Sequence, residues 1–496
     1  MGPPARSRWD DSEAVNKRPG TEIAVSIQMP ASHGVPQSDV LNWRHRILWM
    51  TIAAGSFHLA YLVPACAWSI VGYVFALFQL SRQPNRLHAM NTGWLLAILV
   101  YAPHLFFFWT IFGPTAIALW LVLGFWLGLF LALLRFVREK WGRVAAAWLA
   151  PGLWMGLEFF RSELYYLRFS WLSPGFAFAW TPNLPWIGWV GVYGFGLLLM
   201  AGAGWLSCLP PRRALIVGFA VLAALAVLTN LPRWRPDKLE GRELRVAGMQ
   251  LEFPDAAEVP QRLDVLRARY PDADLYVLSE YTFQEQVPAP VKDWCLKHQK
   301  YLLVGGKEPA ANDEFFNTAY VIDAKGNVAF QQAKAQPIQF FKDGLRASQQ
   351  RVWESPWGRI GVCICYDLSY GRVVDELARQ GAQAILVPTM DVEEWGPYQH
   401  RLHARVGPMR AAEYRVPVFR LASSGISQFV DVTGDVSATK QIPGNGETLA
   451  ATLRLGSPAR RPVDRWLVWP CVLTTCVIAA WGFWLALWDR RRNERV

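Results

Sequence analysis

Charged residues are scarce in this chain of 496 residues: only 18% are Asp, Glu, Lys or Arg, whereas 52% are apolar. An average soluble domain has about 25% charged residues. The 26 tryptophans add to the apolar excess. The composition therefore excludes an ordinary soluble protein and predicts a membrane protein that also carries a soluble part.

Sequence signals for metal and nucleotide chemistry are also missing. The chain has no H-E-x-x-H, no Walker loop and no G-x-G-x-x-G after a predicted strand. Its seven cysteines include one close pair, Cys363 and Cys365, but neither a second pair nor a histidine follows at ligand spacing. We therefore expect no metal ion and no cofactor.

The apolar residues gather in runs on both sides of a more polar segment. A hydrocarbon core of about 30 Å is crossed by roughly 20 apolar residues in a helix. Eight runs approach this length, at residues 47–63, 65–81, 92–112, 115–135, 145–160, 186–207, 213–231 and 466–488. Only Pro64 separates the first two, which could form a tight hairpin or one kinked element. We predict a helical bundle of about eight transmembrane spans.

Basic residues mark alternate junctions between these runs, as the positive-inside rule requires of cytoplasmic loops. They follow the second, fourth, sixth and eighth runs: Arg82, Arg86, Arg135, Arg138, Lys140, Arg143, Arg212, Arg213, Arg490, Arg491 and Arg492. The pattern predicts a cytoplasmic N-terminus and places the soluble segment on the outer face of the membrane. It also explains most of the net charge of +11 without a nucleic-acid partner.

The chain accordingly divides into five parts. Residues 1–43 are rich in Pro, Ser, Gly and charge and are expected to form a disordered cytoplasmic tail. Residues 44–235 carry the first seven spans, 241–455 a soluble domain, 466–488 the eighth span, and 489–496 a basic cytoplasmic tail.

Strand and helix patterns alternate within the soluble segment. Strands are predicted at residues 244–249, 275–278, 301–304, 316–322, 361–365, 384–387 and 418–421, and helices at 258–270, 288–299, 370–380 and 400–415. Such alternation predicts a layered α/β domain whose functional residues lie at strand ends and in loops.

Three residues at such positions could act together. Cys365 ends a β-branched run, Glu280 ends an apolar run, and Lys334 lies between them in sequence. A free thiol titrates at about 8.5 and needs a base, which Glu280 could supply, while Lys334 could stabilise an oxyanion. Each also has a simpler interpretation, as a turn residue, a surface lysine and a core thiol. Cys363 could share a strand face with Cys365, so it stays an alternative nucleophile.

Further motifs surround these three residues in a definite order. They are Glu158-Phe-Phe-Arg161, Phe169-Ser-Trp171 and Gly191-Val-Tyr-Gly194 before the soluble segment, and Phe316-Asn317-Thr-Ala319, Cys365-Tyr366-Asp367, Trp395-Gly396, Gln399-His400 and Arg410-Ala-Ala-Glu413 within it. The series resembles the nitrilase superfamily, and specifically the apolipoprotein N-acyltransferase family.

The resemblance implies a fold and a reaction. The expected fold is a transmembrane bundle carrying a nitrilase-like α-β-β-α sandwich. The expected reaction moves a fatty acyl chain from a phospholipid, through a thioester on Cys365, to the N-terminal amine of a diacylglyceryl-cysteine lipoprotein, with Glu280 as general base and Lys334 as oxyanion stabiliser. It further implies a monomer in a bacterial inner membrane, with the catalytic domain on the periplasmic face.

Other positions are expected to support this site. Tyr366, Asp367 and Trp395 fall in motifs of the family. Glu158 and Arg161 are three residues apart on one helix face, so they could form an interfacial ion pair or contact a phospholipid headgroup. The aromatic residues between Trp171 and Trp189 are predicted to form an interfacial belt.

The chain also departs from the family pattern. Where the family has Pro-Phe-Gly-Glu, this chain reads Gln339-Phe340-Phe341-Lys342-Asp343, so either Asp343 replaces the second glutamate or that carboxylate is absent. The 30 residues between Lys334 and Cys365 are few for the lid of the family. Three functions remain open: the acyltransferase, a membrane-tethered hydrolase or acyltransferase for another amine, and a non-catalytic membrane scaffold.

Overall fold

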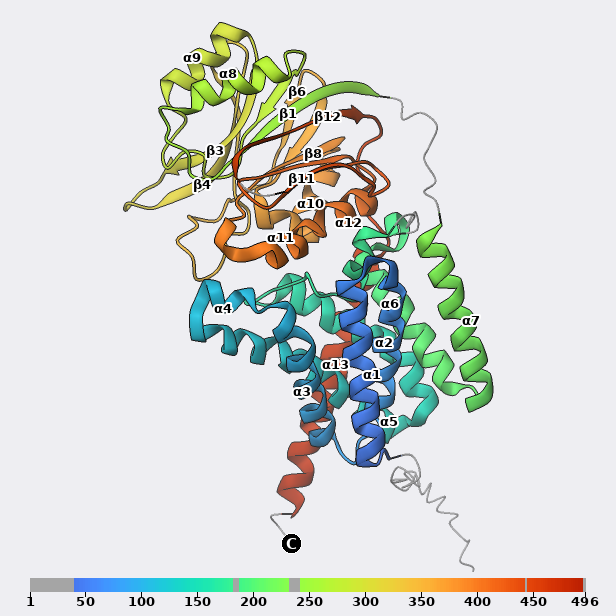
Figure 1. Ribbon diagram of the computed structural model, residues 1–496. Coiled ribbons are helices and arrows are strands. Elements are labelled where there is room, and N and C mark those ends of the chain that lie inside the picture. Colours follow the sequence, from blue (N-terminus) through green and yellow to red (C-terminus); the bar gives the residue numbers. More distant parts are fainter. Residues whose placement is uncertain (1–39, 182–186, 232–240, 442–443, 494–496) are drawn as a thin grey trace, which may run out of the picture.

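A computed structural model describes residues 40–181, 187–231, 241–441 and 444–493. An α/β domain sits on one end of a helical bundle, and the last helix runs back down through the bundle (Figure 1). Most of the predicted N-terminal tail, residues 1–39, and the last three residues of the predicted C-terminal tail lie outside the described residues.

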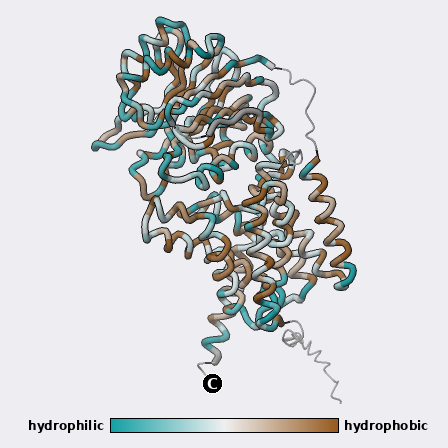
Figure 2. Tube along the Cα trace, in the orientation of Figure 1, coloured by the Kyte–Doolittle hydropathy of each residue, from teal (hydrophilic) through white to brown (hydrophobic). Residues whose placement is uncertain are grey.

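The bundle has helix in each of the eight predicted apolar runs. Its helices are α1 (Trp43–Leu62), α2 (Ile70–Leu80), α3 (Arg86–His104), α4 (Phe107–Phe112), α5 (Ala116–Phe159), α6 (Ile187–Cys208), α7 (Pro211–Asn230) and α13 (Asp464–Asn493), with 3-10 turns at Pro64–Ser69, Gly113–Thr115 and Pro174–Trp180 and a π-helical turn at Phe160–Leu164. Hydrophobic residues run along these helices, α7 among them (Figure 2).

Four helical segments are long and apolar enough to cross a membrane: Phe107–Leu164, Ile187–Cys208, Pro211–Asn230 and Asp464–Arg491. Length and composition therefore do not confirm the predicted count of about eight spans. The remaining helices of the bundle, such as α1 and α3, are shorter or more polar, because histidines and arginines interrupt their apolar runs.

The structure has one of the two alternatives left open at Pro64, and two predicted boundaries change. The segments around Pro64 form a hairpin, in which α1 and α2 pack side by side (Figure 1). The runs at 115–135 and 145–160 belong to one helical element, α5, which is interrupted at Gly142, where φ is 83°. Glycine adopts such a φ without a Cβ clash, so the chain can turn there. The predicted tail at 489–496 is helical as far as Asn493.

The α/β domain contains two six-stranded sheets. In order across the first sheet lie β12 (Asn445–Leu455), β1 (Arg242–Leu251), β2 (Leu275–Val277), β3 (Tyr301–Pro309), β4 (Phe315–Ile322) and β5 (Val328–Ala333). Across the second lie β11 (Val436–Gln441), β10 (Ile426–Val430), β9 (Val418–Ala422), β8 (Ala384–Thr389), β7 (Gly358–Val362) and β6 (Val352–Ser355). Within each sheet the three central strands nearest the site, β1–β3 and β7–β9, are parallel.

Helices cover the outer face of each sheet, which makes an α-β-β-α sandwich. They are α8 (Val259–Arg269) and α9 (Ala289–His298) on the first sheet, and α10 (Gly371–Arg379), α11 (Gly396–Ala404) and α12 (Val406–Tyr414) on the second. β8 is buried along its whole length, as expected of a parallel strand covered on both faces. The apolar core under α10–α12 continues into the bundle, so the two parts share one core.

Two predictions for this domain are wrong in detail. The strand predicted at 361–365 ends at Val362, before both cysteines of the pair. The helix predicted at 400–415 is two helices, α11 and α12, that meet at Arg405. Strands β5, β6, β10, β11 and β12 were not predicted, because several are short or polar and carry little alternation.

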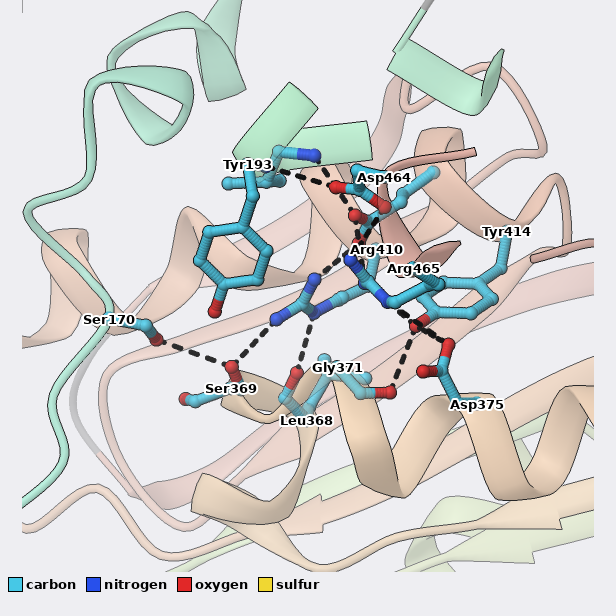
Figure 3. Close-up of polar contacts among 12 residues, drawn as sticks. Ser170, Tyr193, Leu368, Ser369, Gly371, Asp375, Arg410, Tyr414, Asp464 and Arg465 are labelled. Carbon is cyan, nitrogen blue, oxygen red and sulfur yellow. Dashed lines mark hydrogen bonds and ion pairs between the residues drawn. The ribbon is translucent and has the colours of Figure 1, made fainter. Parts of the chain in front are cut away.

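A buried ionic network joins the domain to the bundle (Figure 3). Arg465, at the start of α13, contacts Asp464 at 2.8 Å, Glu413 at 3.0 Å and Asp375 at 3.2 Å. Asp464 accepts the backbone N–H of Tyr193 from α6 at 3.1 Å. These charges are all paired, as buried charges must be to avoid a large desolvation cost. The network therefore ties the last helix to both α6 and the α/β domain.

Candidate functional site

Cys365 begins a 3-10 turn, Cys365–Ser369, just beyond the carboxyl end of β7. Its φ of 52° lies in the left-handed region, which costs a non-glycine residue about 1–3 kcal/mol and persists only where surrounding contacts enforce it. Arg410 supplies such contacts, because its guanidinium donates to the carbonyls of Leu368 at 3.1 Å and Ser369 at 2.7 Å (Figure 3). These two hydrogen bonds from Arg410 hold the turn in place.

Glu280 and Lys334 lie next to each other and are buried. Glu280 follows β2, as predicted, and Lys334 follows β5, a strand that was not predicted. The Lys334 Nζ lies 2.8 Å from Glu280 Oε1. The same carboxylate accepts the side-chain amide of Asn317 at 2.6 Å and the backbone N–H of Met390 at 2.7 Å. The simpler interpretations, a solvated turn residue and a surface lysine, are wrong for both.

Asp343 supplies a second carboxylate to the same lysine. Its Oδ2 lies 2.8 Å from Lys334 Nζ, and its Oδ1 accepts Tyr281 Oη at 2.7 Å and Asn317 Nδ2 at 2.9 Å. Lys342, the neighbouring residue, is exposed. Of the two possibilities left by the sequence, the structure has the one in which Asp343 provides the carboxylate.

Asp367 joins the turn of Cys365 to the segment that follows Lys334. Its carboxylate accepts the backbone N–H groups of Gln336 at 2.7 Å, Ala335 at 3.0 Å and Ile364 at 3.2 Å. Burial raises the pKa of Asp367 to about 6 against the opposing effects of Lys334 and these N–H groups. Asp367 therefore fixes the distance between two loops and does not point toward the thiol.

The electrostatics of the site suit a base-assisted thiol. Burial, followed by the charge of Glu280, raises the pKa of Cys365 well above its usual value, so the thiol is protonated at rest. Burial also raises the pKa of Glu280, which Lys334 opposes and Asp343 reinforces. Burial acts to lower the pKa of Lys334, but Asp343 and Glu280 outweigh it and keep the ammonium charged. A buried thiol beside a carboxylate of raised pKa is an arrangement for proton transfer.

Cys363 does not share a face with Cys365, contrary to the strand-based expectation. Its side chain is buried in the core beneath α10 and α12, whereas Cys365 borders the core between the two sheets. Alternation fails because the strand ends at Val362 and the left-handed φ of Cys365 redirects its side chain. Burial, followed by the charge of Asp367, raises the pKa of Cys363 as well.

An apolar cavity of about 110 Å³ opens beside Cys365 and extends into the bundle. Its walls come from α4 and the start of α5 on the membrane side, from the segment around Phe340 and Phe341, and from Trp395. Tyr366 also lines it, and its hydroxyl donates to the carbonyl of Arg168 at 3.4 Å. A thiol that lines an apolar cavity shared with long apolar helices can meet a lipid chain without drawing it into water.

Trp171 belongs to this cavity and not to an interfacial belt, so that expectation is wrong for it. Its ring is buried, and its Nε1 donates to Ser369 Oγ at 2.9 Å. The ring also meets Tyr366 edge-on at a centroid distance of 5.6 Å. Its apolar neighbours in sequence gave no sign that it would contact a turn about 200 positions later.

Glu158 and Arg161 do not form the expected ion pair among the described residues. Both are buried, and both border a small cavity of about 20 Å³ with Trp126 and Trp154. Arg161, in the π-helical turn Phe160–Leu164, donates from Nη1 to the carbonyl of Phe169 at 3.2 Å. Arg161 therefore braces the loop that carries Trp171, and neither residue lines the Cys365 cavity.

One polar group at the cavity escaped the sequence reasoning. His403, on α11, lines the cavity, and its Nδ1 lies 2.7 Å from Asp391 Oδ1. Asp391 in turn pairs with Arg420 at 2.5 Å. The spacing of Gln399 and His403, four residues apart on one helix, was the available signal, since both line the cavity. Within the described ranges, no three His, Cys, Asp or Glu side chains are placed to hold a metal ion.

Two family models match separate parts of the chain. The apolipoprotein N-acyltransferase N-terminal domain matches residues 48–205, and carbon-nitrogen hydrolase matches residues 265–460. Between them they cover the bundle from α1 to most of α6 and the α/β sandwich from β2 onward, in the order that the structure shows.

Curated relatives carry the same name. The apolipoprotein N-acyltransferase of Nitrosomonas europaea is 24% identical over 377 residues, which span 64% of this chain and 71% of the relative. That of Brucella melitensis is 27% identical over about half of each chain, and that of Agrobacterium fabrum is 32% identical over 36% of this chain and 38% of the relative. For the Brucella melitensis and Agrobacterium fabrum relatives the matched part is therefore less than two thirds of their length.

Among solved structures, Saccharomyces cerevisiae Nit3, a member of the nitrilase superfamily, is similar over 44% of this chain and 93% of its own, with 20% identity and a TM-score of 0.38. With both family models and the curated relatives in agreement, the chain belongs to the apolipoprotein N-acyltransferase family, a family of acyltransferases within the nitrilase (carbon-nitrogen hydrolase) superfamily.

Proposed function

We propose that this protein transfers a fatty acyl chain from a membrane phospholipid, through a thioester on Cys365, to the N-terminal amine of a diacylglyceryl-cysteine lipoprotein. The observation that carries the proposal is the apolar cavity, which Cys365 lines together with residues of α4 and α5. Removing an acyl chain from lipid into water costs about 0.8 kcal/mol per CH₂, and a cavity continuous with the membrane part avoids this cost.

The residues of the site have distinct tasks in the first half-reaction. Glu280 takes the thiol proton as the sulfur attacks the ester carbonyl of the phospholipid, and Lys334 stabilises the oxyanion that forms. Glu280 then returns the proton to the glycerol oxygen as the lysophospholipid leaves. Asp343 and Asn317 hold Lys334 and Glu280 in position.

The proposal includes the membrane topology. Among the described residues the chain crosses the membrane eight times, if α5 is counted as two spans that meet at Gly142. The basic junctions between the spans then lie on the cytoplasmic side. The α/β domain accordingly faces the periplasm of a bacterial inner membrane, where lipoproteins receive their acyl chains. The protein acts as a monomer with the bilayer, a phospholipid and the lipoprotein as its partners.

Intact-mass measurement of the purified protein tests the proposal. Incubation with a defined phospholipid is expected to add one acyl mass to the protein, and a diacylglyceryl-cysteine peptide is expected to remove this mass and gain it. Release of free fatty acid without acylated peptide would instead identify a hydrolase. A protein that reacts with iodoacetamide but gains no acyl mass would contradict the proposal.

Val122→Trp is expected to slow acylation by long-chain phospholipids while leaving the thiol reactive. Val122 lines the cavity from α5, and the larger ring would exclude part of the chain. Exclusion of two methylene groups, at about 0.8 kcal/mol each, corresponds to a loss of about tenfold. The acylation rate with phospholipids of graded chain length measures the effect, with alkylation by iodoacetamide as the reference.

Leu121→Trp is the matched control, because Leu121 is the adjacent residue of α5, is 37% exposed and does not line the cavity. Equal losses in both variants, or equal losses for short and long chains, would contradict the assignment of the cavity to the acyl chain.

A further inference from the structure

His403 lies in the wall of the cavity that holds Cys365, and the first half-reaction does not use it. The imidazole is 3% exposed. The Trp171 ring stacks on it with a centroid distance of 4.8 Å and an interplanar angle of 19°. Stacking on Trp171 and the contact with Asp391 thus fix the position of the imidazole in the cavity wall.

The hydrogen bonds of His403 determine which nitrogen carries the proton. Burial acts to raise the pKa of Asp391, but His403 and Arg420 outweigh burial and keep it well below its usual value, so Asp391 is ionised. Two groups lie against Nδ1: the ionised carboxylate of Asp391 at 2.7 Å and Arg420 Nη2 at 3.0 Å. Arg420 Nη2 can only donate and already donates to Asp391 Oδ2, so the shorter contact assigns the proton to Nδ1, which donates to Asp391, and leaves the lone pair on Nε2. Burial lowers the pKa of His403, which keeps this neutral form at neutral pH.

Nε2 makes no hydrogen bond to any residue in the described part of the chain; both contacts of the ring are at Nδ1. Glu280 differs in this respect, because Oε1 already accepts Lys334 and Asn317, and Oε2 accepts the N–H of Met390. The site therefore has one base, Glu280, whose oxygens are engaged, and the cavity wall has a second base, His403, whose Nε2 is open.

We propose that His403 is a second general base of this site, and that its Nε2 accepts the proton of the incoming amine in the transfer half-reaction. This inference rests on the proposed function. The amine nitrogen forms a bond to the thioester carbonyl carbon, the C–S bond breaks, and its electron pair stays on Cys365. The amine proton passes to Nε2 and then to the Cys365 thiolate, which restores the thiol and the neutral imidazole.

This assignment divides the work between two bases. Glu280 serves the acylation of Cys365 from the phospholipid, and His403 serves the removal of the acyl chain by the amine. The charged or titratable groups around the imidazole, which its titration must reflect, are Asp391, Arg420, Lys334, Cys365, Tyr366 and Arg168.

The test uses the full chain and separates the two half-reactions. Acyl-enzyme is formed with a defined phospholipid and followed by intact mass, and a diacylglyceryl-cysteine peptide is then added across the pH range in which imidazole titrates. His403→Gln retains a donor for Asp391 but no base. We expect it to form acyl-enzyme at nearly the normal rate and to transfer about 10²–10⁴-fold more slowly, without the acid limb of the unsubstituted protein.

His298→Gln is the matched control, because His298 lies at the end of α9, outside the cavity, and its loss should change neither step. Equal slowing of both half-reactions in His403→Gln would overturn the proposal in favour of a structural role. Unchanged transfer with an unchanged pH profile would also overturn it. Restoration of transfer by added imidazole in His403→Ala would support it, since a packing defect is not repaired in this way.

A measurement on the unsubstituted protein guards against a variant that fails to fold. Transfer to a hydrazide analogue of the acceptor, whose amine stays neutral throughout, should still show an acid limb if an imidazole accepts the proton. A flat profile would overturn the role of His403. Failure of the underlying function looks different, because then the unsubstituted protein forms no acyl-enzyme at all.

Discussion

Cys365→Ala is expected to abolish both acyl-enzyme formation and transfer, a loss on the order of 10⁶-fold, as for removal of the nucleophile in other covalent mechanisms. No other cysteine in the described part of the chain lines the cavity. Loss of the sulfur should change folding little, because Arg410 and Asp367 hold the turn through its backbone groups. Intact mass after incubation with a phospholipid measures the loss.

Cys363→Ala is the matched control, because it makes the same chemical change two residues away. Its sulfur lies in the core beneath α10 and α12, so this variant should keep the acyl adduct and lose only some packing energy. If the adduct persisted in Cys365→Ala and disappeared in Cys363→Ala, the nucleophile would have to be reassigned.

The positions of Glu280 and Cys365 were predictable because each follows a strand with a recognisable apolar run, whereas β5, which leads to Lys334, was not predicted. Glu280 and Lys334 follow strands of one sheet, and Cys365 follows a strand of the other. In a sandwich built from two sheets with parallel central strands, the carboxyl ends meet at one edge. Predicted strand ends were therefore the signal for Glu280 and Cys365, and residue type and order in the chain were the signal for Lys334.

The walls of the site were not predictable, because they come from segments far apart in sequence. The side chains of α4 and α5 precede Cys365 by more than two hundred positions, and they look like any other lipid-facing residues. In the sequence, Trp171 lies in an aromatic segment between predicted spans, which is also where an interfacial tryptophan would lie. Only the docking of the α/β domain on the bundle, through the network of Arg465 and Glu413, determines which apolar residues face the thiol.

Polar partners also escaped local reasoning. The Asp391, His403 and Arg420 cluster brings together a strand end, a helix and a neighbouring strand, and no spacing in the sequence marks the three as a unit. The strand boundary before Cys363 was missed for a related reason, since a β-branched run continues past the point where Asp367 draws the backbone into a turn. Side-chain capping of this kind overrides strand propensity.

Lys334→Met is expected to remove activity and stability together. It would leave Glu280 and Asp343, both buried, without their shared cation, and breaking a buried ion pair in this way costs about 3–5 kcal/mol. Loss of the oxyanion-stabilising charge should slow acylation by about 10²–10³-fold beyond any effect of unfolding. The apparent unfolding temperature in detergent and the rate of acyl-enzyme formation measure the two effects.

Lys342→Met supplies the comparison for a lysine of the same segment. Lys342 is exposed and makes no ion pair in the described part of the chain, so this variant should match the unsubstituted protein in both measurements. Equal effects at the two lysines would mean that Lys334 acts only through the charge of the segment.

A triple variant separates the two roles of Lys334. Adding Glu280→Gln and Asp343→Asn to Lys334→Met removes both orphaned charges, and the amides can still bond to Asn317, Tyr281 and the backbone. Replacing a whole buried ion cluster by neutral groups is often nearly neutral for stability. The unfolding temperature should therefore recover most of its loss, while acyl-enzyme formation stays absent because the base and the oxyanion charge are both gone. Recovery of activity along with stability would show that the three charged groups maintain the fold and do not take part in the chemistry.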